Sequence, residues 1–588
     1  MRCLTDREIT LLEENGCRAD DWQQVAVDDE AFRADRVRDV QFYGQVTIGS
    51  LSGTMDIEEG FTRPCGIAHA TLRNVDIGDD CLVENVRGHI ANYRIGNHCL
   101  VQNIGVLAVQ GETTFGNGQT ICVLREAGEA NVVLHEQLTA QTAALMLREP
   151  GVRRLYAEHT PSHAQTGEMG DYARLVGTRE VINTRIGEGA EIAYASRLSE
   201  TTVLSGAFVG ADVILDGCIV AQGASVTDAA YANRCYVGEA VRLGKGFSAE
   251  NSLFFAGSEM LGGEACAAFC GPFSCSHHKS TLLIGGAFAF YNAGSGTNQS
   301  NHAYKTGPVH WGTLLRGCKT ASGCHILWPA TIGAFSMVMG KVTTHPDTTL
   351  LPFSYVFGQE GRTVVVPGIN LRSCGTWRDV HKWPKRDLRE PTARHDLLQW
   401  AFPNPLIAEQ VLAGKALLGQ WLAESDDADE WIERDTFAVR RTAAAAGIRY
   451  YDLALRLFIH ETLQCGYKPT TSAPAVSGWV DLAGMLAPDE EIDRIIRDVN
   501  DRTIDSVDEL TDILASVHAA YPQNAADYLP QLLRQLGDDP LADPDNWAAE
   551  GEEAYRLWLR MVQADAEREY QLGDIPEDYL RQFINSIQ

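Results

Sequence analysis

The feature that most constrains this chain is an aliphatic residue that recurs every six positions. The string IGDDCL at 77–82 returns as IGNHCL at 95–100, a displacement of 18 residues, or three times six. A period of six cannot place apolar residues on one face of a helix with 3.6 residues per turn. It suits short strands whose aliphatic side chain points inward and whose next, small residue lets the backbone turn. Further residues at this spacing are Ile186, Ile192, Leu198 and Leu204.

Three such strands make one coil, and coils stack about 4.8 Å apart through parallel hydrogen-bond ladders. The pattern predicts a mainly β protein with a parallel β-helix over residues 41–134 and 176–375. Cys81 and Cys99 hold equivalent places in the repeat, so we expect both in the interior of the β-helix rather than in a reactive site.

This pattern resembles the hexapeptide-repeat superfamily of left-handed parallel β-helices, which contains acyltransferases and sugar-nucleotide enzymes. The left hand, an acyl-transfer activity with a histidine base, and a homotrimer are what this resemblance implies. The run from Cys270 to Arg389 is also similar to a large bacterial family with a β-helix and a helical C-terminal region. That similarity brings no reaction with it, and it rests on the strings GPFSCSHHKSTLLIGG, NAGSGTNQSNHAYK and WPKRD.

Changes in residue composition and in the spacing of apolar residues predict that the chain has five segments. Helix-favouring residues interrupt the hexads after Glu136, and beyond Pro391 apolar residues adopt the i, i+3, i+4 spacing of helices. We expect the acidic helical part to cover the last coil or to make an oligomer contact, with substrate recognition as the alternative. The parts are an N-terminal helical segment (1–38), a first β-helix block (39–134), a helical insertion (135–175), a second β-helix block with the active site (176–389) and an acidic α-helical domain (390–588).

Composition bounds the partners and the compartment. The chain has 49 Lys and Arg against 78 Asp and Glu, a formal net charge of −29. This balance argues against a nucleic acid or an anionic membrane surface as the main partner. The N-terminus lacks an apolar signal segment, and no stretch has the length of a membrane span. We therefore expect a cytoplasmic protein; its 15 cysteines include no zinc-module spacing, even at Cys266, Cys270 and Cys275.

Charge is distributed unevenly along the second β-helix block. No Asp or Glu occurs from Ala265 to Pro346, yet this stretch holds six of the sixteen histidines. From Lys279 to Arg389 there are twelve Lys and Arg against four acidic residues, a local charge of +8. Such a zone concentrates anionic ligands, and its interspersed aromatic residues can stack on a sugar or a base. The alternative is that the stretch is only the tightly packed middle of the β-helix.

Two polar clusters carry the predicted site. In SHHKS at 276–280, a histidine can act as general base at neutral pH. In GSGTNQSNH at 294–302, backbone N–H groups can meet an anion and the amides can meet sugar hydroxyls. We expect the catalytic base among His277, His278 and His302. The predicted substrate contacts are Lys279, Asn298, Gln299, Asn301, Lys305, His310, Arg372 and Lys385.

The sequence thus favours a transferase, with acyl transfer to a phosphorylated or nucleotide-linked sugar. No tightly bound cofactor is expected, and an acyl-CoA or another acyl donor would be the co-substrate. One alternative is a metal-dependent hydrolase or lyase, in which His277, His302 and His310 resemble the three zinc-binding histidines that β-helical carbonic anhydrases assemble across a subunit boundary. Another is a non-catalytic sugar-phosphate sensor or scaffold. The expected partners are an anionic small molecule and further copies of the chain.

Overall fold

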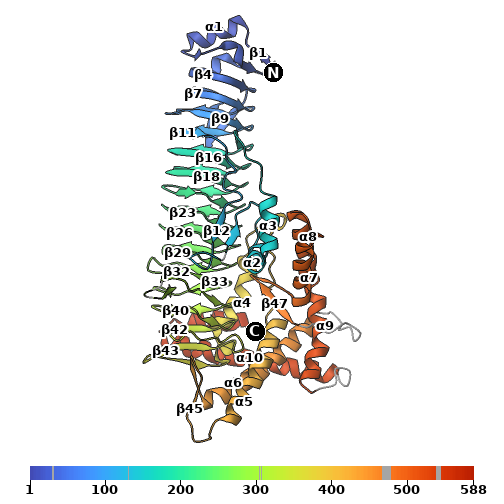
Figure 1. Ribbon diagram of the computed structural model, residues 1–588. Helices are drawn as coiled ribbons and strands as arrows, with labels where there is room; N and C mark the ends of the chain where they lie inside the picture. Colours follow the sequence, from blue (N-terminus) through green and yellow to red (C-terminus); the bar gives the residue numbers. More distant parts are fainter. Residues whose placement is uncertain are drawn as a thin grey trace.

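The chain folds into a long β-solenoid with helices packed along its C-terminal half (Figure 1). The computed structural model describes residues 1–28, 32–129, 131–303, 305, 307–465, 478–537 and 544–587. Within these ranges, 40 strands join one continuous sheet whose neighbouring coils pair almost entirely in parallel. The predicted mainly β parallel β-helix with an α-helical C-terminal region is therefore confirmed.

The hexads mark the rungs of the solenoid as expected. Ile77 pairs with Ile95, and Leu82 pairs with Leu100. Cys81 and Cys99 are fully buried, and each thiol donates to a backbone carbonyl of the next coil, at 3.0 and 3.1 Å. The strands of this block include β4 (Val37–Ile48), β7 (Gly66–Ile77), β8 (Leu82–Glu84), β9 (Ile90–Ile95), β10 (Leu100–Gln102) and β11 (Val106–Ala108).

The second block has three faces, each a stack of short strands. Face A contains β19 (Phe208–Val209), β22 (Ser225–Val226), β25 (Arg242–Gly244), β28 (Glu259–Leu261), β31 (Cys275–Ser276), β34 (Asn292–Ala293) and β39 (Lys319–Thr320). Face B contains β20 (Ile214–Asp216), β23 (Tyr231–Asn233), β26 (Ser248–Glu250), β29 (Glu264–Cys266), β32 (Leu282–Ile284), β35 (Asn298–Ser300) and β40 (His325–Leu327). Face C contains β21 (Ile219–Val220), β24 (Tyr236–Val237), β27 (Leu253–Phe254), β30 (Phe269–Cys270), β33 (Gly286–Phe288), β38 (Gly312–Leu314) and β41 (Thr331–Ile332).

Coil length explains why the hexad weakens in this block. Phe208 pairs with Ser225, 17 residues on, so the coils are one residue shorter than the 18 of the first block. The same corner of successive coils holds Gly206 and Gly223 at φ of 64° and 68°, which a glycine adopts without strain. A larger break follows β35, where the hairpin β36 (His302–Ala303) and β37 (Gly307–Pro308) is inserted.

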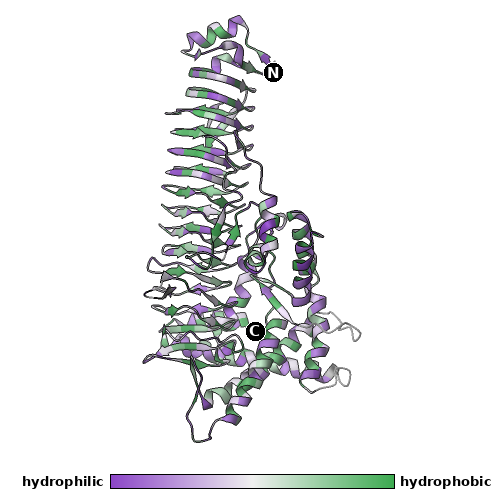
Figure 2. Cartoon of the chain, viewed as in Figure 1, coloured by the Kyte–Doolittle hydropathy of each residue, from purple (hydrophilic) through white to green (hydrophobic). Residues whose placement is uncertain are grey.

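Hydrophobic and hydrophilic residues are interspersed along the strands (Figure 2), because successive side chains point to opposite faces of a strand. On face C, the inward residues Val220, Val237 and Phe254 are fully buried in the solenoid core. The outward residues of the same strands are apolar too, and they form a stripe that a second layer must cover. The stripe consists of Ile219, Tyr236, Leu253 and Phe269.

The insertion and the C-terminal helices supply this cover. The stripe packs in one apolar cluster with α2 (Ala140–Arg148), α3 (Pro150–Glu158), the hairpin of β47 (Trp479–Leu482) and β48 (Met485–Pro488), α7 (Asp489–Asn500) and α8 (Val507–Ala519). Other helices pack at the last coils or against one another: the Tyr451 hydroxyl donates to the Pro352 carbonyl at 3.0 Å. The Trp558 indole donates to the Leu371 carbonyl at 2.8 Å. These helices are α4 (Cys374–Arg386), α5 (Pro405–Glu424), α6 (Arg441–Gln464), α9 (Tyr521–Gln535), α10 (Pro544–Leu572) and α11 (Glu577–Ile587).

The N-terminal segment, expected to be helical, contains strands as well as a helix. It has a single α-helix, α1 (Asp6–Glu14), with Thr5 and Glu8 forming a capping box. The strands β1 (Arg2–Cys3), β2 (Arg18–Ala19) and β3 (Val25–Val27) join the solenoid sheet. This segment therefore starts the solenoid as well as covering its end. Among the described helices, none combines the length and apolarity that crossing a membrane requires.

Candidate functional site

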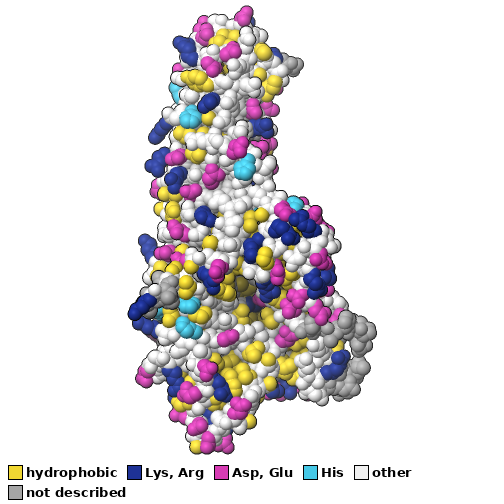
Figure 3. Space-filling view, viewed as in Figure 1, with side chains coloured by type: hydrophobic (Ala, Val, Ile, Leu, Met, Phe, Trp, Pro, Cys, Tyr) yellow, Lys and Arg dark blue, Asp and Glu magenta, His cyan; other side chains and the backbone are white. Residues whose placement is uncertain are grey.

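A cleft of about 420 Å³ lies between face C and the helical region (Figure 3). Its solenoid wall consists of Phe269, Ala287 and Thr313, which follow one another on three successive coils. The opposite walls come from α2, from the start of α5 and from the β47–β48 hairpin. Most of the lining is apolar, and a cleft of this size suits a small-molecule ligand.

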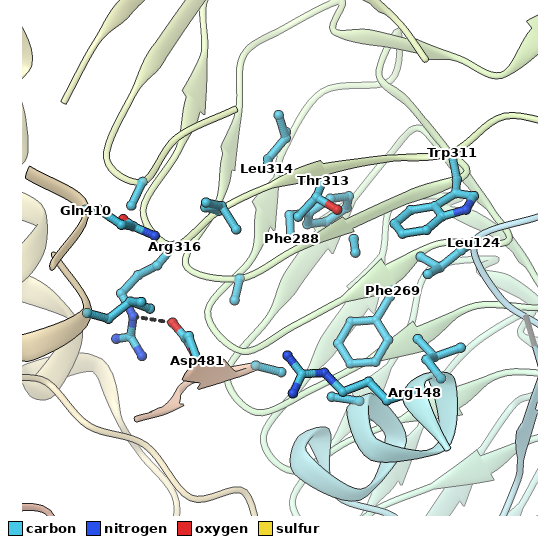
Figure 4. Close-up of a pocket in the computed structure, with 18 of the residues that line it drawn as sticks. Leu124, Arg148, Phe269, Phe288, Trp311, Thr313, Leu314, Arg316, Gln410 and Asp481 are labelled. Atoms are coloured by element: carbon cyan, nitrogen blue, oxygen red, sulfur yellow. Dashed lines mark hydrogen bonds and ion pairs between the residues drawn. The ribbon is translucent and has the colours of Figure 1, made fainter. Parts of the chain in front are cut away.

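One guanidinium in the cleft is available for a ligand. Arg148 is the last residue of α2, and it reaches beneath Phe269 toward Asp481 (Figure 4). Its side chain is exposed, and within the described residues it makes no ion pair or hydrogen bond. An unpaired guanidinium beside an apolar wall favours an anion that also carries an apolar group.

Buried contacts fix the helix that presents Arg148. The Gln141 amide donates to the carbonyls of Leu397 and Leu482, at 3.1 Å each. The Asp396 carboxylate accepts hydrogen bonds from the backbone N–H groups of Ala140, at 2.7 Å, and Ala256, at 2.8 Å. Burial, and then the nearby charge of Glu239, raise the pKa of Asp396 to about 6. The N-terminus of α2 is thereby attached to the solenoid.

A second arginine has a different role, because its donors are already used. The Arg316 Nε lies 2.7 Å from Asp481 Oδ2, and its two Nη groups donate to the carbonyls of Gln399 and Gly484 at 2.9 Å. Its guanidinium also lies 4.5 Å from the ring centre of Phe290. Arg316 therefore joins the solenoid to the β47–β48 hairpin and shapes one wall of the cleft (Figure 4).

One buried acceptor in the cleft lacks a partner. Gln410 of α5 is only 8% exposed, and its Oε1 accepts no hydrogen bond from the described residues. A buried amide oxygen without a donor is costly, so a ligand hydroxyl or N–H group would stabilise it. Among its described lining residues, the cleft thus offers apolar walls, the unpaired Arg148 cation and the unpaired Gln410 acceptor.

Two of the predicted histidines, His277 and His278, do not line this cleft. His277 follows β31 on face A, where its Nε2 lies 2.8 Å from Glu259 Oε2 and 3.1 Å from Cys275 Sγ. His278 and Lys279 are exposed at the next corner. Burial, followed by the charge of Glu259, raises the pKa of the Cys275 thiol to about 11.

The second predicted cluster is divided between the interior and the outer surface of face B. Gln299 takes an inward position next to Ile326 and is fully buried, whereas Asn298 is half-buried on the outer side. The Asn301 amide is buried and donates to Glu126. Because its side chain points into the solenoid, Gln299 is a core residue.

The hairpin beside these residues reaches the cleft at one end. The backbone of His302 pairs with Pro308, and the side chain of His302 lies outside the described part. Lys305 is exposed, and half-buried His310 directly precedes Trp311, which lines the cleft.

The remaining predicted contacts lie on other elements. Arg372 ends a short 3-10 helix at Ile369–Arg372, and Lys385 lies in the last turn of α4. This helix packs beside face A, where Asp379 forms an ion pair with Lys319 of β39. Lys385 therefore belongs to a helix beside face A, the face that carries His277.

The cleft residues that sequence reasoning missed come from distant parts of the chain. Arg148 belongs to a segment predicted only as a helical insertion, and Gln410 and Asp481 lie in the predicted helical domain. No local motif links them. The one available signal was the outward apolar series on face C, which requires a covering layer and so predicts a contact between domains.

Comparison with known proteins identifies the family of this chain. A family model described as a domain of unknown function, DUF4954, matches residues 1–422. The chain belongs to the DUF4954 family. The matched region holds the solenoid, α2 and most of α5, and a second model, domain of unknown function DUF6819, matches residues 460–572. An uncharacterized protein of Treponema pallidum (strain Nichols) is 23% identical over 571 residues, covering 85% of this chain and 77% of that protein. The cleft is therefore built from the DUF4954 region together with the hairpin of the DUF6819 region.

Proposed function

We propose that the protein is a transferase that holds an acyl-bearing anion in the cleft. The acyl group passes to a phosphorylated or nucleotide-linked sugar. The observation that carries this proposal is the unpaired Arg148 guanidinium beside the apolar wall of Phe269 and Ala287. The apolar wall suits the acyl chain, and Arg148 suits a phosphate or carboxylate on the same donor molecule.

The acceptor side of the reaction is assigned to the end of the cleft at Trp311. His302 and His310 belong to the inserted hairpin and its following residues, so either can serve as the base that takes the proton of an acceptor hydroxyl or amine. Lys305 on the same hairpin supplies a cation for a phosphorylated acceptor. His277 and His278 lie at the side of face A, away from the cleft, so this proposal does not use them as the base.

The resemblance to hexapeptide-repeat acyltransferases supports acyl transfer over other group transfers. It also supports a left-handed coil and a homotrimer, which sedimentation analysis of the full chain would test. Because Gln410 Oε1 is buried and accepts no hydrogen bond from the described residues, the donor should also carry a hydroxyl or amide N–H group that reaches α5.

The test measures binding of acyl-CoAs with short and long chains to the full-length protein by calorimetry, followed by turnover with sugar phosphates. R148A should weaken binding by about 10- to 100-fold, because a hydrogen bond to a charged group is lost. The matched control is R154A, since Arg154 is exposed on α3 and does not line the cleft. Equal binding by both variants would refute the cleft assignment. Binding without transfer to any acceptor would refute the transferase and leave a sensor.

A further inference from the structure

A second group of side chains lies on face A, away from the cleft. Strand pairing places Arg242, Glu259, Cys275 and Asn292 at equivalent outward positions of four successive coils. Since coils are about 4.8 Å apart, Glu259 and Cys275 are direct neighbours. His277 comes two residues after Cys275, so the alternation of side chains directs it to the same surface.

The three potential ligand atoms converge. His277 Nε2 lies 2.8 Å from Glu259 Oε2 and 3.1 Å from Cys275 Sγ, and all three atoms lie within 4.8 Å of one another. Zinc bonds of 2.0–2.3 Å in a tetrahedral site place neighbouring ligand atoms about 3.3–3.6 Å apart. The observed separations therefore need to open by only about half an ångström to admit a metal ion.

The same geometry argues against a nucleophile triad. In such a triad, the acid orients the histidine through one ring nitrogen while the other nitrogen faces the nucleophile. Here Glu259 and Cys275 both contact Nε2, so Glu259 cannot orient the ring for an attack by Cys275. Nε2 instead faces both partners, so one nitrogen, one oxygen and one sulfur atom surround a common point.

We propose that Glu259, Cys275 and His277 bind a divalent transition metal of the zinc type. One sulfur, one nitrogen and one oxygen ligand suit zinc, and three protein ligands leave a fourth position open. Solvent can reach it, since the side chains of His277 and Glu259 are 42% and 28% exposed. On binding, the Cys275 thiol becomes a thiolate and releases its proton to water.

The surroundings indicate what occupies the fourth position. Lys382 and Arg386 of α4 lie close enough to act electrostatically on Cys275, and Arg242 lies 3.9 Å from the other oxygen of Glu259. Asp379 of α4 also acts on Cys275, but it is paired with Lys319, so the cations outnumber the unpaired acids around the ligand set. This balance favours an anion, such as phosphate or a carboxylate, as the exchangeable ligand. This site is independent of the cleft and of the transferase proposed there.

The experiment uses the full-length protein, stripped with a chelator and titrated with zinc or cobalt(II). We expect one equivalent to bind, a sulfur-to-cobalt charge-transfer band, and a zinc-dependent rise in melting temperature. C275S should abolish the band, and C275S and H277A should each weaken zinc binding at least 100-fold, since even outer partners of a metal site contribute about 10- to 100-fold. The matched controls, C266S and H278A, should bind like the wild type.

Three outcomes would overturn the proposal: binding below one equivalent, an unchanged charge-transfer band in C275S, or equal losses in the controls. Circular dichroism of each metal-free variant separates a lost ligand from a lost fold. Calorimetry of the metal-free wild type with acyl-CoA tests the cleft separately, so failure of either proposal leaves the other distinguishable.

Discussion

The buried contact between Arg316 and Asp481 permits a quantitative test of how the helical region is held on the solenoid. The side chains of Arg316 and Asp481 are 6% and 16% exposed, with 2.7 Å between Nε and Oδ2. D481A leaves the guanidinium buried with only two carbonyl acceptors. Removing one partner of a buried ion pair costs about 3–5 kcal/mol. Because Asp481 Oδ1 also accepts the Gly484 N–H at 2.6 Å, the hairpin turn loses a hydrogen bond as well.

Hydrogen exchange at the amides of the β47–β48 hairpin measures this loss locally. A cost of 3–5 kcal/mol corresponds to a decrease in protection of about 10²- to 10⁴-fold. The double variant R316M/D481A should recover much of the protection, because no uncompensated charge remains. The matched control is E491A on α7, whose partner Arg494 also lies at 2.7 Å but in an exposed pair. That variant should lose less than about 1 kcal/mol. Equal losses in D481A and E491A would refute the reasoning from burial.

Three further predictions concern stability. Burial, and then the charge of Asp489, raise the pKa of Glu409 from 4.5 to about 7. Its folded state therefore binds the extra proton, so stability should fall by up to about 3 kcal/mol as pH rises from 4.5 to 7. E409Q should flatten this slope in chemical unfolding, and an unchanged slope would contradict the assignment. G312A should destabilise by at least 1–3 kcal/mol, because the added Cβ would lie 2.1 Å from Trp328. G419A, in an open part of α5, should instead stabilise the protein by roughly 1 kcal/mol. Calorimetry measures both melting temperatures, and a higher melting temperature for G312A than for G419A would contradict both predictions.

The solenoid could be predicted because every coil needs inward aliphatic residues and small turn residues at the same positions. The hexads at 77–82 and 95–100 pair in the expected register, and Cys81 and Cys99 occupy the interior. The repeat pattern could also have placed Gln299. Its position in β35 points inward, beside Ile326, although its amide group suggested a ligand contact. Periodicity determines which way a side chain points more reliably than residue type does.

The sites were harder to predict because they depend on contacts between coils and domains. Glu259 lies just outside the acid-free stretch in sequence, yet one coil brings it onto Cys275. Arg148 and Asp481 are more than 300 residues apart, and both line one cleft. A coil of about 17 residues could have linked the first pair, whereas nothing local could have linked the second.

The hydrogen bond from Gln141 to Leu482 spans 341 residues. Ribosomes add about 5–20 residues per second, so α2 waits roughly 20 to 70 seconds after its own synthesis for the hairpin that buries it. During that interval the apolar face of α2 remains exposed to solvent beside the solenoid as it forms. This stage of synthesis is therefore the one at which binding by a chaperone would protect the chain most.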